Sequence, residues 1–324
     1  MRAVLCKTLG GPDDLVVEEV SPPTLAEGQV RLETAACGVN FPDTLIIAGK
    51  YQYKPDLPFS PGGEVSGRIA ELGPGVAGWS VGDEVIAMTG WGGFAEQVVT
   101  TPDRLLARPD TMDPVTAAGF AMTYGTTYHA LVQRAALQPG ETLLVLGAAG
   151  GVGLAAVELG KALGARVIAA ASSPEKLEIA RQAGADDLID YSKESLKDAT
   201  KGLTDGKGAD VIYDPVGGDL FDQATRAINW KGRLLVIGFA SGRIPSYPAN
   251  LALLKGASLV GVFWGAFRER EPEVNEENFR QLFALHAAGK IKPLISQTYP
   301  LEQAAEALTT FIERRAVGKL VLKV

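Results

Sequence analysis

The sequence predicts an α/β protein with two domains, one rich in short strands and one built around a doubly wound parallel sheet. The length of 324 residues suits about two domains, each large enough to bury its own core. To about residue 122 the chain has short apolar runs separated by turn signals. Beyond that point apolar strands alternate with helical segments, and a glycine-rich turn joins the first strand of this series to its helix.

Turn signals divide the first part of the chain into short strands. Residues 10–12 (Gly-Gly-Pro) and 73–75 (Gly-Pro-Gly) are two such turns. The predicted strands span residues 2–7, 15–20, 29–36, 64–71, 84–88 and 94–99. Several short strands at this spacing predict a small, irregular, barrel-like β unit.

The second part of the chain predicts a parallel sheet covered by helices on both faces. Its predicted strands span residues 142–146, 166–170, 188–189, 210–213, 233–237 and 258–262, and its helices residues 152–163, 174–182 and 220–228. After about residue 265 the series stops. Two amphipathic helices near 276–288 and 301–314 and a last strand at 319–323 follow, and we expect this tail to return to the first domain.

Composition excludes several classes of partner. The formal net charge is −7 and the pI about 5.1, with no basic stripe for nucleic acid and no basic helix for a membrane surface. The longest uncharged apolar stretch, between Glu141 and Glu158, has 16 residues, fewer than the roughly 20 that span a bilayer. The N-terminus lacks the apolar core of a signal peptide, and two cysteines cannot form a disulfide framework. We therefore expect a soluble protein of the reducing cytoplasm that binds neither nucleic acid nor membrane.

The glycine-rich turn is the strongest motif. Residues 146–153 read Leu-Gly-Ala-Ala-Gly-Gly-Val-Gly between a predicted strand and a predicted helix. In that context glycines let backbone N–H groups approach a pyrophosphate at the positive end of the helix. This predicts a dinucleotide site at Gly150, Gly151, Val152 and Gly153. The alternative interpretation is a tight turn that binds no ligand.

The next strand indicates which dinucleotide binds. An NAD site usually carries an acidic residue about 20 positions after the turn, on the ribose 2′-OH. Here residues 171–176 read Ala-Ser-Ser-Pro-Glu-Lys, with no acid at the strand tip. Ser172, Ser173 and Lys176 can bind a 2′-phosphate, which a carboxylate would repel, and this favours NADPH over NADH. The two serines can also cap the helix that begins at Pro174, and both roles are compatible.

Four segments in order resemble one family. They are residues 36–43 (Ala-Cys-Gly-Val-Asn-Phe-Pro-Asp), 61–64 (Pro-Gly-Gly-Glu), 148–153 and 318–322 (Gly-Lys-Leu-Val-Leu). Over essentially its whole length the chain resembles the medium-chain dehydrogenase/reductase superfamily, within it the zinc-independent quinone oxidoreductases of the zeta-crystallin-like branch. The resemblance implies a GroES-like catalytic domain formed by residues 1–122 and 266–324, with a Rossmann NADPH-binding domain at 123–265 between them.

The chain departs from the pattern of the zinc alcohol dehydrogenases at the positions of their zinc ligands. The position of a zinc-binding cysteine in those relatives is Asn40, and that of a zinc-binding histidine is Gly63. About three protein ligands are needed for catalytic zinc, so we expect no metal site, and a structural salt bridge for Glu64. Without a Lewis acid, acceptors that take hydride unaided are favoured, namely quinones or alkenes conjugated to a carbonyl.

The resemblance also implies site residues. Asn40, Tyr51 and Trp264 are the candidate catalytic groups: the Asn40 amide would bind a substrate carbonyl or a nicotinamide ribose, and the Tyr51 phenol would line the acceptor pocket or donate a proton. A tyrosine that the family commonly has five residues after this asparagine is replaced by Leu45. Further cofactor contacts are implied at Asn40, Thr126, Tyr191, Val216, Gly238, Phe239, Ala240, Ser241, Val262, Phe263 and Trp264. For Phe263 and Trp264, core or interface packing is the alternative.

The function these observations favour is a metal-independent NADPH:quinone oxidoreductase. One alternative is an NADPH-dependent enone or enoyl-thioester reductase, acting on a 2-alkenal or an enoyl-CoA. Another, of a different class, is a non-catalytic NADPH-binding protein of the crystallin kind. The resemblance also implies a homodimer that pairs through the strand near residues 258–262, which would otherwise be an exposed sheet edge.

Overall fold

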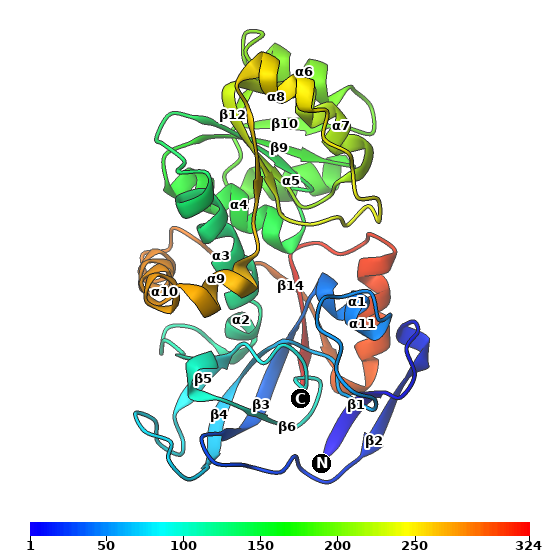
Figure 1. The fold of residues 1–324 in the computed structure, drawn as a ribbon, viewed down its shortest axis with the longest axis vertical. Coiled ribbons are helices and arrows are strands. Elements are labelled where there is room, and N and C mark those ends of the chain that lie inside the picture. Colours follow the sequence, from blue (N-terminus) through cyan, green and yellow to red (C-terminus); the bar gives the residue numbers. More distant parts are fainter. The chain divides into compact units, whose positions relative to one another are not determined.

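A computed structural model describes all residues from 1 to 324. The chain divides into two compact units (Figure 1). Unit 1 contains Met1–Met122 and Pro293–Val324, and unit 2 contains Thr123–Lys292. None of the helices combines the length and the apolar character that crossing a bilayer requires.

Unit 1 is built on a seven-stranded sheet in which β14, β15, β3, β4, β5 and β7 are neighbours in that order, while β6 also pairs with β3. A separate antiparallel ribbon is formed by β1 and β2. The strands are β1 (Arg2–Cys6), β2 (Leu15–Glu19), β3 (Val30–Val39), β4 (Glu64–Leu72), β5 (Glu84–Ala87), β6 (Gln97–Thr100), β7 (Leu105–Ala107), β14 (Ile295–Pro300) and β15 (Lys319–Lys323). The helices are α1 (Phe41–Ile47), α2 (Pro114–Ala118) and α11 (Ala304–Ile312), with short 3₁₀ turns η1 (Pro12–Asp14), η2 (Pro102–Arg104) and η4 (Leu301–Gln303).

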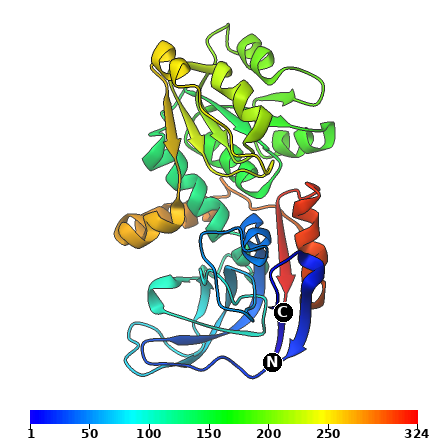
Figure 2. The same cartoon turned by 45° about the vertical axis from the view of Figure 1, so that its right-hand side comes forward.

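The last strand of the chain closes this sheet. β15 pairs antiparallel with β3, so that Leu322 lies opposite Cys37 and Val321 opposite Gly38, and the red C-terminal strand runs beside the blue N-terminal part in Figure 2. Four of the five residues of β15 are buried. The terminal strand is therefore part of the core of unit 1.

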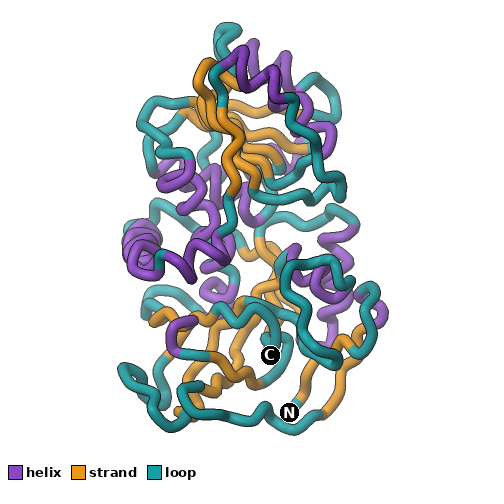
Figure 3. Tube along the Cα trace, in the orientation of Figure 1, coloured by secondary structure: helices purple, strands orange, loops and turns teal.

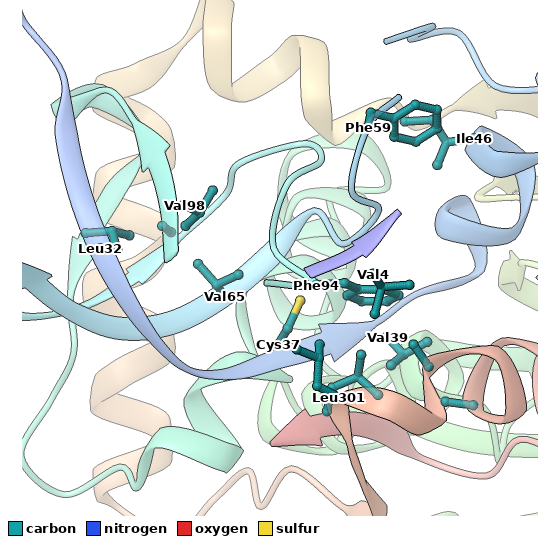
Figure 4. Close-up of a cluster of buried hydrophobic side chains, with 14 of the residues drawn as sticks. Val4, Leu32, Cys37, Val39, Ile46, Phe59, Val65, Phe94, Val98 and Leu301 are labelled. Carbon is teal, nitrogen blue, oxygen red and sulfur yellow. The ribbon is translucent and has the colours of Figure 1, made fainter. Parts of the chain in front are cut away.

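A hydrophobic core fills unit 1. In Figure 4 side chains from β1, β3, β4 and β6 face one another around Cys37, together with Phe94 and Leu301. Alternate residues in the first half of β3, such as Val30 and Leu32, are fully buried, as expected for a strand with one face on a core. The core fixes the position of the end of β3, which Asn40 directly follows.

Unit 2 contains a six-stranded parallel sheet with the order β10-β9-β8-β11-β12-β13. Numbered within this unit, that is the doubly wound order 3-2-1-4-5-6, which confirms the predicted parallel sheet. Its strands are β8 (Thr142–Leu146), β9 (Arg166–Ala171), β10 (Asp187–Asp190), β11 (Ala209–Asp214), β12 (Ile228–Val236) and β13 (Ser258–Gly261). Central strands such as β8 are almost wholly apolar because helices cover them (Figure 3).

The helices of unit 2 mostly connect its strands. They are α3 (Ala121–Tyr128, whose first two residues belong to unit 1), the π-helix η3 (His129–Arg134), α4 (Gly151–Ala162), α5 (Pro174–Gln182), α6 (Leu196–Leu203), α7 (Gly218–Ala227), α8 (Ala249–Lys255), α9 (Trp264–Arg270) and α10 (Pro272–Ala287). α5 begins as its sequence indicates: Pro174 occupies the first turn, and the Ser173 hydroxyl accepts a hydrogen bond from the Lys176 N–H.

Residues 266–292 lie in unit 2, whereas we expected them in the first domain. The reason is a set of polar contacts with the helices that flank the parallel sheet. Gln133 and Asn278 exchange side-chain hydrogen bonds of 2.8 and 3.2 Å. The backbone N–H of Lys292 donates to the buried carboxylate of Glu158 at 3.2 Å. These contacts tie the segment to unit 2 at Asn278 and at Lys292.

Candidate functional site

The glycine-rich turn joins β8 to α4 at the carboxyl end of the sheet. Gly147 has a φ of +59°, a conformation that favours glycine. A Cβ on Gly153 would lie 2.2 Å from the Gly147 carbonyl oxygen, so only glycine allows α4 to start this close to the turn. The first N–H groups of a helix have no intrahelical partner. Those of Gly151, Val152 and Gly153 are thus available to an anionic ligand at the start of α4.

The end of β11 lies beside this turn, because β8 and β11 are neighbours in the sheet although they are far apart in sequence. The Asp214 carboxylate accepts hydrogen bonds from the N–H groups of Val216 and Gly217 at 2.8 and 2.9 Å. Burial raises the pKa of Asp214, and these two N–H groups oppose the rise. A Cβ on Gly147 would approach the Val216 side chain to 3.0 Å. The strand order of the sheet reverses between β8 and β11, so these two strand ends form a topological switch point. Open parallel sheets bind their ligands at such a point.

The segment after β12 completes this edge of the sheet. The Ala240 N–H donates to the Pro215 carbonyl at 3.1 Å, and the Ser241 N–H donates to the Val216 carbonyl at 2.9 Å. A Cβ on Gly238 would touch Pro215, and one on Gly217 would touch the Phe239 ring. The structure thus brings together the turn of residues 147–153 and the predicted cofactor contacts Val216, Gly238, Phe239, Ala240 and Ser241.

The predicted 2′-phosphate site follows β9. Ser172 is exposed, whereas Ser173 caps α5 and its hydroxyl donates to the Glu175 carboxylate, which lowers the pKa of Glu175. The Tyr191 N–H donates to the Ala171 carbonyl at 3.2 Å, so Tyr191 follows the neighbouring strand tip. Glu175 was absent from the sequence-based set of site residues, and its carboxylate is the group there that opposes an anion.

Trp264 is packed inside unit 2. Its indole N–H donates to Asn275 at 3.0 Å and its ring meets Phe279 edge-on, with ring centroids 6.2 Å apart. A Cβ on Gly125 would touch the indole at 2.7 Å. This geometry holds the segment of Val262 and Phe263 in place, and the Phe263 side chain is 49% exposed. Of the predicted nicotinamide-side groups, Thr126 is partly buried in the middle of α3.

In unit 1, Asn40 lies between β3 and α1 in a buried polar cluster. Its side-chain nitrogen donates to the Gly38 carbonyl at 3.2 Å and to Glu64 Oε2 at 3.1 Å. Its Oδ1 accepts a hydrogen bond of 2.6 Å from the ammonium of Lys319. Asn40, Glu64 and Lys319 are each at most 5% exposed. The cluster joins the end of β3 to the starts of β4 and β15.

Glu64 forms the salt bridge that the sequence predicted, and its partner is Lys319. The ammonium lies 3.1 Å from Glu64 Oε2. The other carboxylate oxygen, Oε1, accepts the Met122 N–H at 2.8 Å. Sequence reasoning missed Lys319. The available signal was its place in the Gly-Lys-Leu-Val-Leu segment, where a charged residue directly precedes three apolar residues.

Asp43 is a second buried carboxylate that sequence reasoning missed. It is 3% exposed and accepts the Asn40 N–H at 2.8 Å. Burial raises the pKa of Asp43 to about 7, against the opposing effects of N–H donors and of Lys319. A proton therefore binds here close to neutral pH.

Tyr51 lies on the loop after α1. It is half-buried against the core of unit 1, its ring centroid is 5.9 Å from that of Tyr53, and burial raises the pKa of its phenol. Next to this loop is a hollow of about 340 Å³. Its lining is mostly apolar and consists of Leu9, Ile46, Gly49, Lys54, Pro55, Asp56, Leu57 and Phe59.

These features define a class of protein. A strand-rich unit closed by the C-terminal strand, combined with a doubly wound sheet that carries a glycine-rich turn, is the architecture of a medium-chain dehydrogenase/reductase. A family model described as alcohol dehydrogenase GroES-like domain matches residues 26–110, and one described as zinc-binding dehydrogenase matches residues 151–280. The predicted fold class is thereby confirmed for both parts.

Similarity to known proteins identifies the branch of this superfamily. A quinone oxidoreductase-like protein 2 homolog of Nematostella vectensis is 44% identical, over 99% of this chain and 88% of that protein. A quinone oxidoreductase of Pseudomonas aeruginosa is 36% identical, over 97% and 96% of the two chains. The crystal structure of Escherichia coli quinone oxidoreductase complexed with NADPH superposes with a TM-score of 0.93 at 29% identity, over 100% of both chains. The chain belongs to the zinc-independent quinone oxidoreductase branch of the superfamily.

The zinc named in one family model does not suit the donors present here. At the two positions that resemble zinc ligands, Asn40 offers an amide oxygen already bonded to an ammonium, and Gly63 offers no side chain. A Cβ on Gly63 would lie 2.9 Å from the Gly90 carbonyl oxygen. No group of three or more His, Cys, Asp or Glu side chains lies close enough to hold a metal ion. A cation in this cluster is supplied by the chain itself.

Proposed function

We propose that this protein is an NADPH-dependent oxidoreductase that transfers a hydride to a quinone without a metal. The observation that carries the proposal is the meeting of three segments at one edge of the parallel sheet: the turn of residues 147–153, Val216 and residues 238–241. Glycine at Gly147 and Gly153 permits a close backbone approach, and the start of α4 suits a pyrophosphate. The NADPH bound to the Escherichia coli relative supports the choice of cofactor.

Preference for the phosphorylated dinucleotide is assigned to Ser172, Ser173 and Lys176. Ser173 contributes by shaping the first turn of α5, because its hydroxyl is engaged with the Lys176 N–H and with Glu175. Ser172 is exposed at the end of β9 and is the hydroxyl best placed to meet a phosphate. We assign Tyr191 to the adenosine, since it follows the adjacent strand tip.

When bound, NADPH supplies the hydride, and the protein orients the acceptor and the nicotinamide. On the acceptor side we assign Asn40 and Tyr51, and on the nicotinamide side Thr126 and the segment of Val262, Phe263 and Trp264. The packed indole of Trp264 gives it the role of holding this segment. A quinone needs no Lewis acid to accept hydride, which agrees with a cluster that suits no zinc.

We also propose a homodimer that pairs through β13. This strand is the edge of its sheet and carries Leu259, which is 43% exposed. Nearby, α8 packs against β12 and presents Leu253 and Leu254, exposed by 82% and 68%. An apolar edge strand beside an exposed apolar helix is a surface that proteins normally cover. Light scattering tests this, and a monomer at micromolar concentration would reject it.

The decisive experiment is the loss of NADPH absorbance with 1,4-benzoquinone, a simple enone or crotonyl-CoA as acceptor, after treatment with EDTA and with NADH as control. We expect rapid oxidation with the quinone that survives chelation. Faster reduction of the enone or of the thioester would instead favour the second activity on the same scaffold. Tight NADPH binding without turnover of any acceptor would favour a non-catalytic nucleotide-binding protein.

A further inference from the structure

The buried cluster of unit 1 holds one cation where the resemblance places a metal. The Lys319 ammonium is 4% exposed and donates three hydrogen bonds: to Asn40 Oδ1 at 2.6 Å, to Glu64 Oε2 at 3.1 Å and to the Val39 carbonyl at 3.3 Å. An ammonium has three donors, so every one of them is used. Lys319 therefore has no donor free for a ligand, and it acts only on the residues of its own cluster.

These contacts settle the orientation of the Asn40 amide. An ammonium donates and cannot accept, so the atom 2.6 Å from Lys319 must be the amide oxygen. The amide nitrogen then faces Gly38 and Glu64, and both of its protons are engaged there. What remains of the side chain is the second lone pair of Oδ1. Asn40 can accept one further hydrogen bond and has no proton to donate.

We propose that Lys319 is a positioning residue that takes the place of a metal ion beside Asn40. It holds the amide oxygen as the one open atom, so that Asn40 binds a hydroxyl group rather than a carbonyl oxygen. This rests on the proposed function, in which Asn40 contacts the cofactor or the acceptor. Of the two roles expected for Asn40, the proposal keeps the ribose hydroxyl and removes the substrate carbonyl, which would need an amide donor.

The hydroxyl has two possible sources with the same chemistry. A ribose hydroxyl of the dinucleotide is one, and a hydroxyl of the reduced, protonated acceptor is the other. Both would donate to Oδ1 of Asn40. A carbonyl of the oxidised quinone would meet only a lone pair and would be repelled. Binding of the nucleotide and kinetics of the acceptor separate the two sources.

The test compares a double variant, in which the cluster stays electrically balanced, with a single variant that keeps the Lys319 ammonium but loses the Glu64 carboxylate. Removing Lys319 alone leaves the Glu64 carboxylate buried without a counter-ion, which is strongly destabilising. The double variant Lys319→Met with Glu64→Gln removes both charges. The single variant Glu64→Gln keeps the ammonium on Asn40 and is its matched reference. Lys323→Met, on the exposed end of β15, controls for the loss of a lysine from that strand.

Two readouts are measured on each variant after thermal unfolding shows that it is folded: the NADPH dissociation constant by fluorescence, and KM and kcat for 1,4-benzoquinone. We expect one of these readouts, NADPH affinity or kcat, to be about tenfold lower in the double variant than in Glu64→Gln. A tenfold change is the equivalent of one hydrogen bond. A loss in the NADPH dissociation constant places the hydroxyl on the nucleotide. A loss in kcat at unchanged NADPH affinity places it on the acceptor.

The outcome that overturns the proposal is a folded double variant whose NADPH affinity, KM and kcat all equal those of Glu64→Gln. Lys319 would then be structural only. A structure of the double variant adds a check that does not depend on activity, because the Asn40 amide should turn once its oxygen is released. Wild-type protein that binds NADPH but reduces no quinone would contradict the proposed function, while the affinity comparison would still decide the role of Lys319.

Discussion

The ammonium of Lys319 lies 2.6 Å from the side-chain oxygen of Asn40, although 279 positions separate them in the chain. The contact exists because β15 adds to the sheet beside β3 and places its first residue at the end of that strand. With Glu64 as the shared partner, it joins the two ends of unit 1 through a buried ion pair. Several consequences of this cluster and of the nucleotide turn can be measured.

Loss of the buried cation should destabilise the protein. In Lys319→Met the Glu64 carboxylate stays buried with no ammonium beside it, and breaking a buried pair in this way typically costs about 3–5 kcal/mol. Chemical denaturation measures the effect. Lys323→Met, which removes an exposed lysine from the same strand, should change the free energy of unfolding by less than about 0.5 kcal/mol. Equal stability of the two variants would show that the ion pair contributes nothing.

Asp43 should make stability depend on pH between its unfolded and folded pKa values. Burial raises the pKa of Asp43 to about 7 from 3.8, so over this range the native state holds a proton that the unfolded state releases. The free energy of unfolding should therefore fall as pH rises, by up to about 1.4 kcal/mol per pH unit. This contribution is complete below pH 3.8 and is lost as pH passes about 7.

Replacing Asp43 by asparagine removes the proton and keeps an oxygen for the Asn40 N–H. We expect Asp43→Asn to unfold with a flatter pH dependence than wild type between about pH 5 and about pH 8. The control is Asp13→Asn, at an exposed aspartate of the same unit, which should keep the wild-type slope. Parallel curves for wild type and Asp43→Asn would argue against a raised pKa.

The nucleotide turn should not tolerate a side chain at Gly153. A Cβ there would lie 2.2 Å from the Gly147 carbonyl oxygen, so the turn must move away from the start of α4. Gly153→Ala should weaken NADPH binding by about tenfold or more, since the backbone donors lose their alignment. In Gly202→Ala, on α6, the new Cβ has no heavy atom within 4 Å. That variant should bind NADPH normally, and similar affinities for both would reject the role of the turn.

Cofactor preference should depend on Lys176. Lys176→Ala should raise the dissociation constant for NADPH and barely affect that for NADH, because only the former carries a 2′-phosphate. Lys207→Ala, at an exposed lysine of the same unit, serves as control for the general loss of positive charge. Titration of both nucleotides by fluorescence reads the result. An equal effect on the dissociation constants for NADPH and NADH would contradict the assignment of Lys176 to the 2′-phosphate.

Local pattern was enough for much of unit 2. Continuous apolar runs predicted the buried strands β8 and β9, and the Ser-Pro start at Ser173 and Pro174 predicted α5, all within a residue or two. The short helices α1, α6 and α8 escaped prediction. Each has only seven or eight residues, too few to establish a period.

The nucleotide turn was visible in the sequence because its chemistry is local: glycines, a strand before and a helix after. The position of residues 266–292 was not, because it depends on the side-chain pair of Gln133 and Asn278 and on the Lys292 N–H at Glu158. The sequence pattern of an amphipathic helix does not indicate which surface of the protein the helix will cover. Their partner is decided by which complementary groups the fold presents.

The sequence by itself determined the class of fold, the dinucleotide turn, and a cluster that lacks zinc ligands at Asn40 and Gly63. The tertiary structure decided what replaces them. Lys319 and Asn40 meet only because β15 pairs with β3 across nearly the whole length of the chain. A buried charge gains its partner from such long-range pairing, and no local pattern of residues records it.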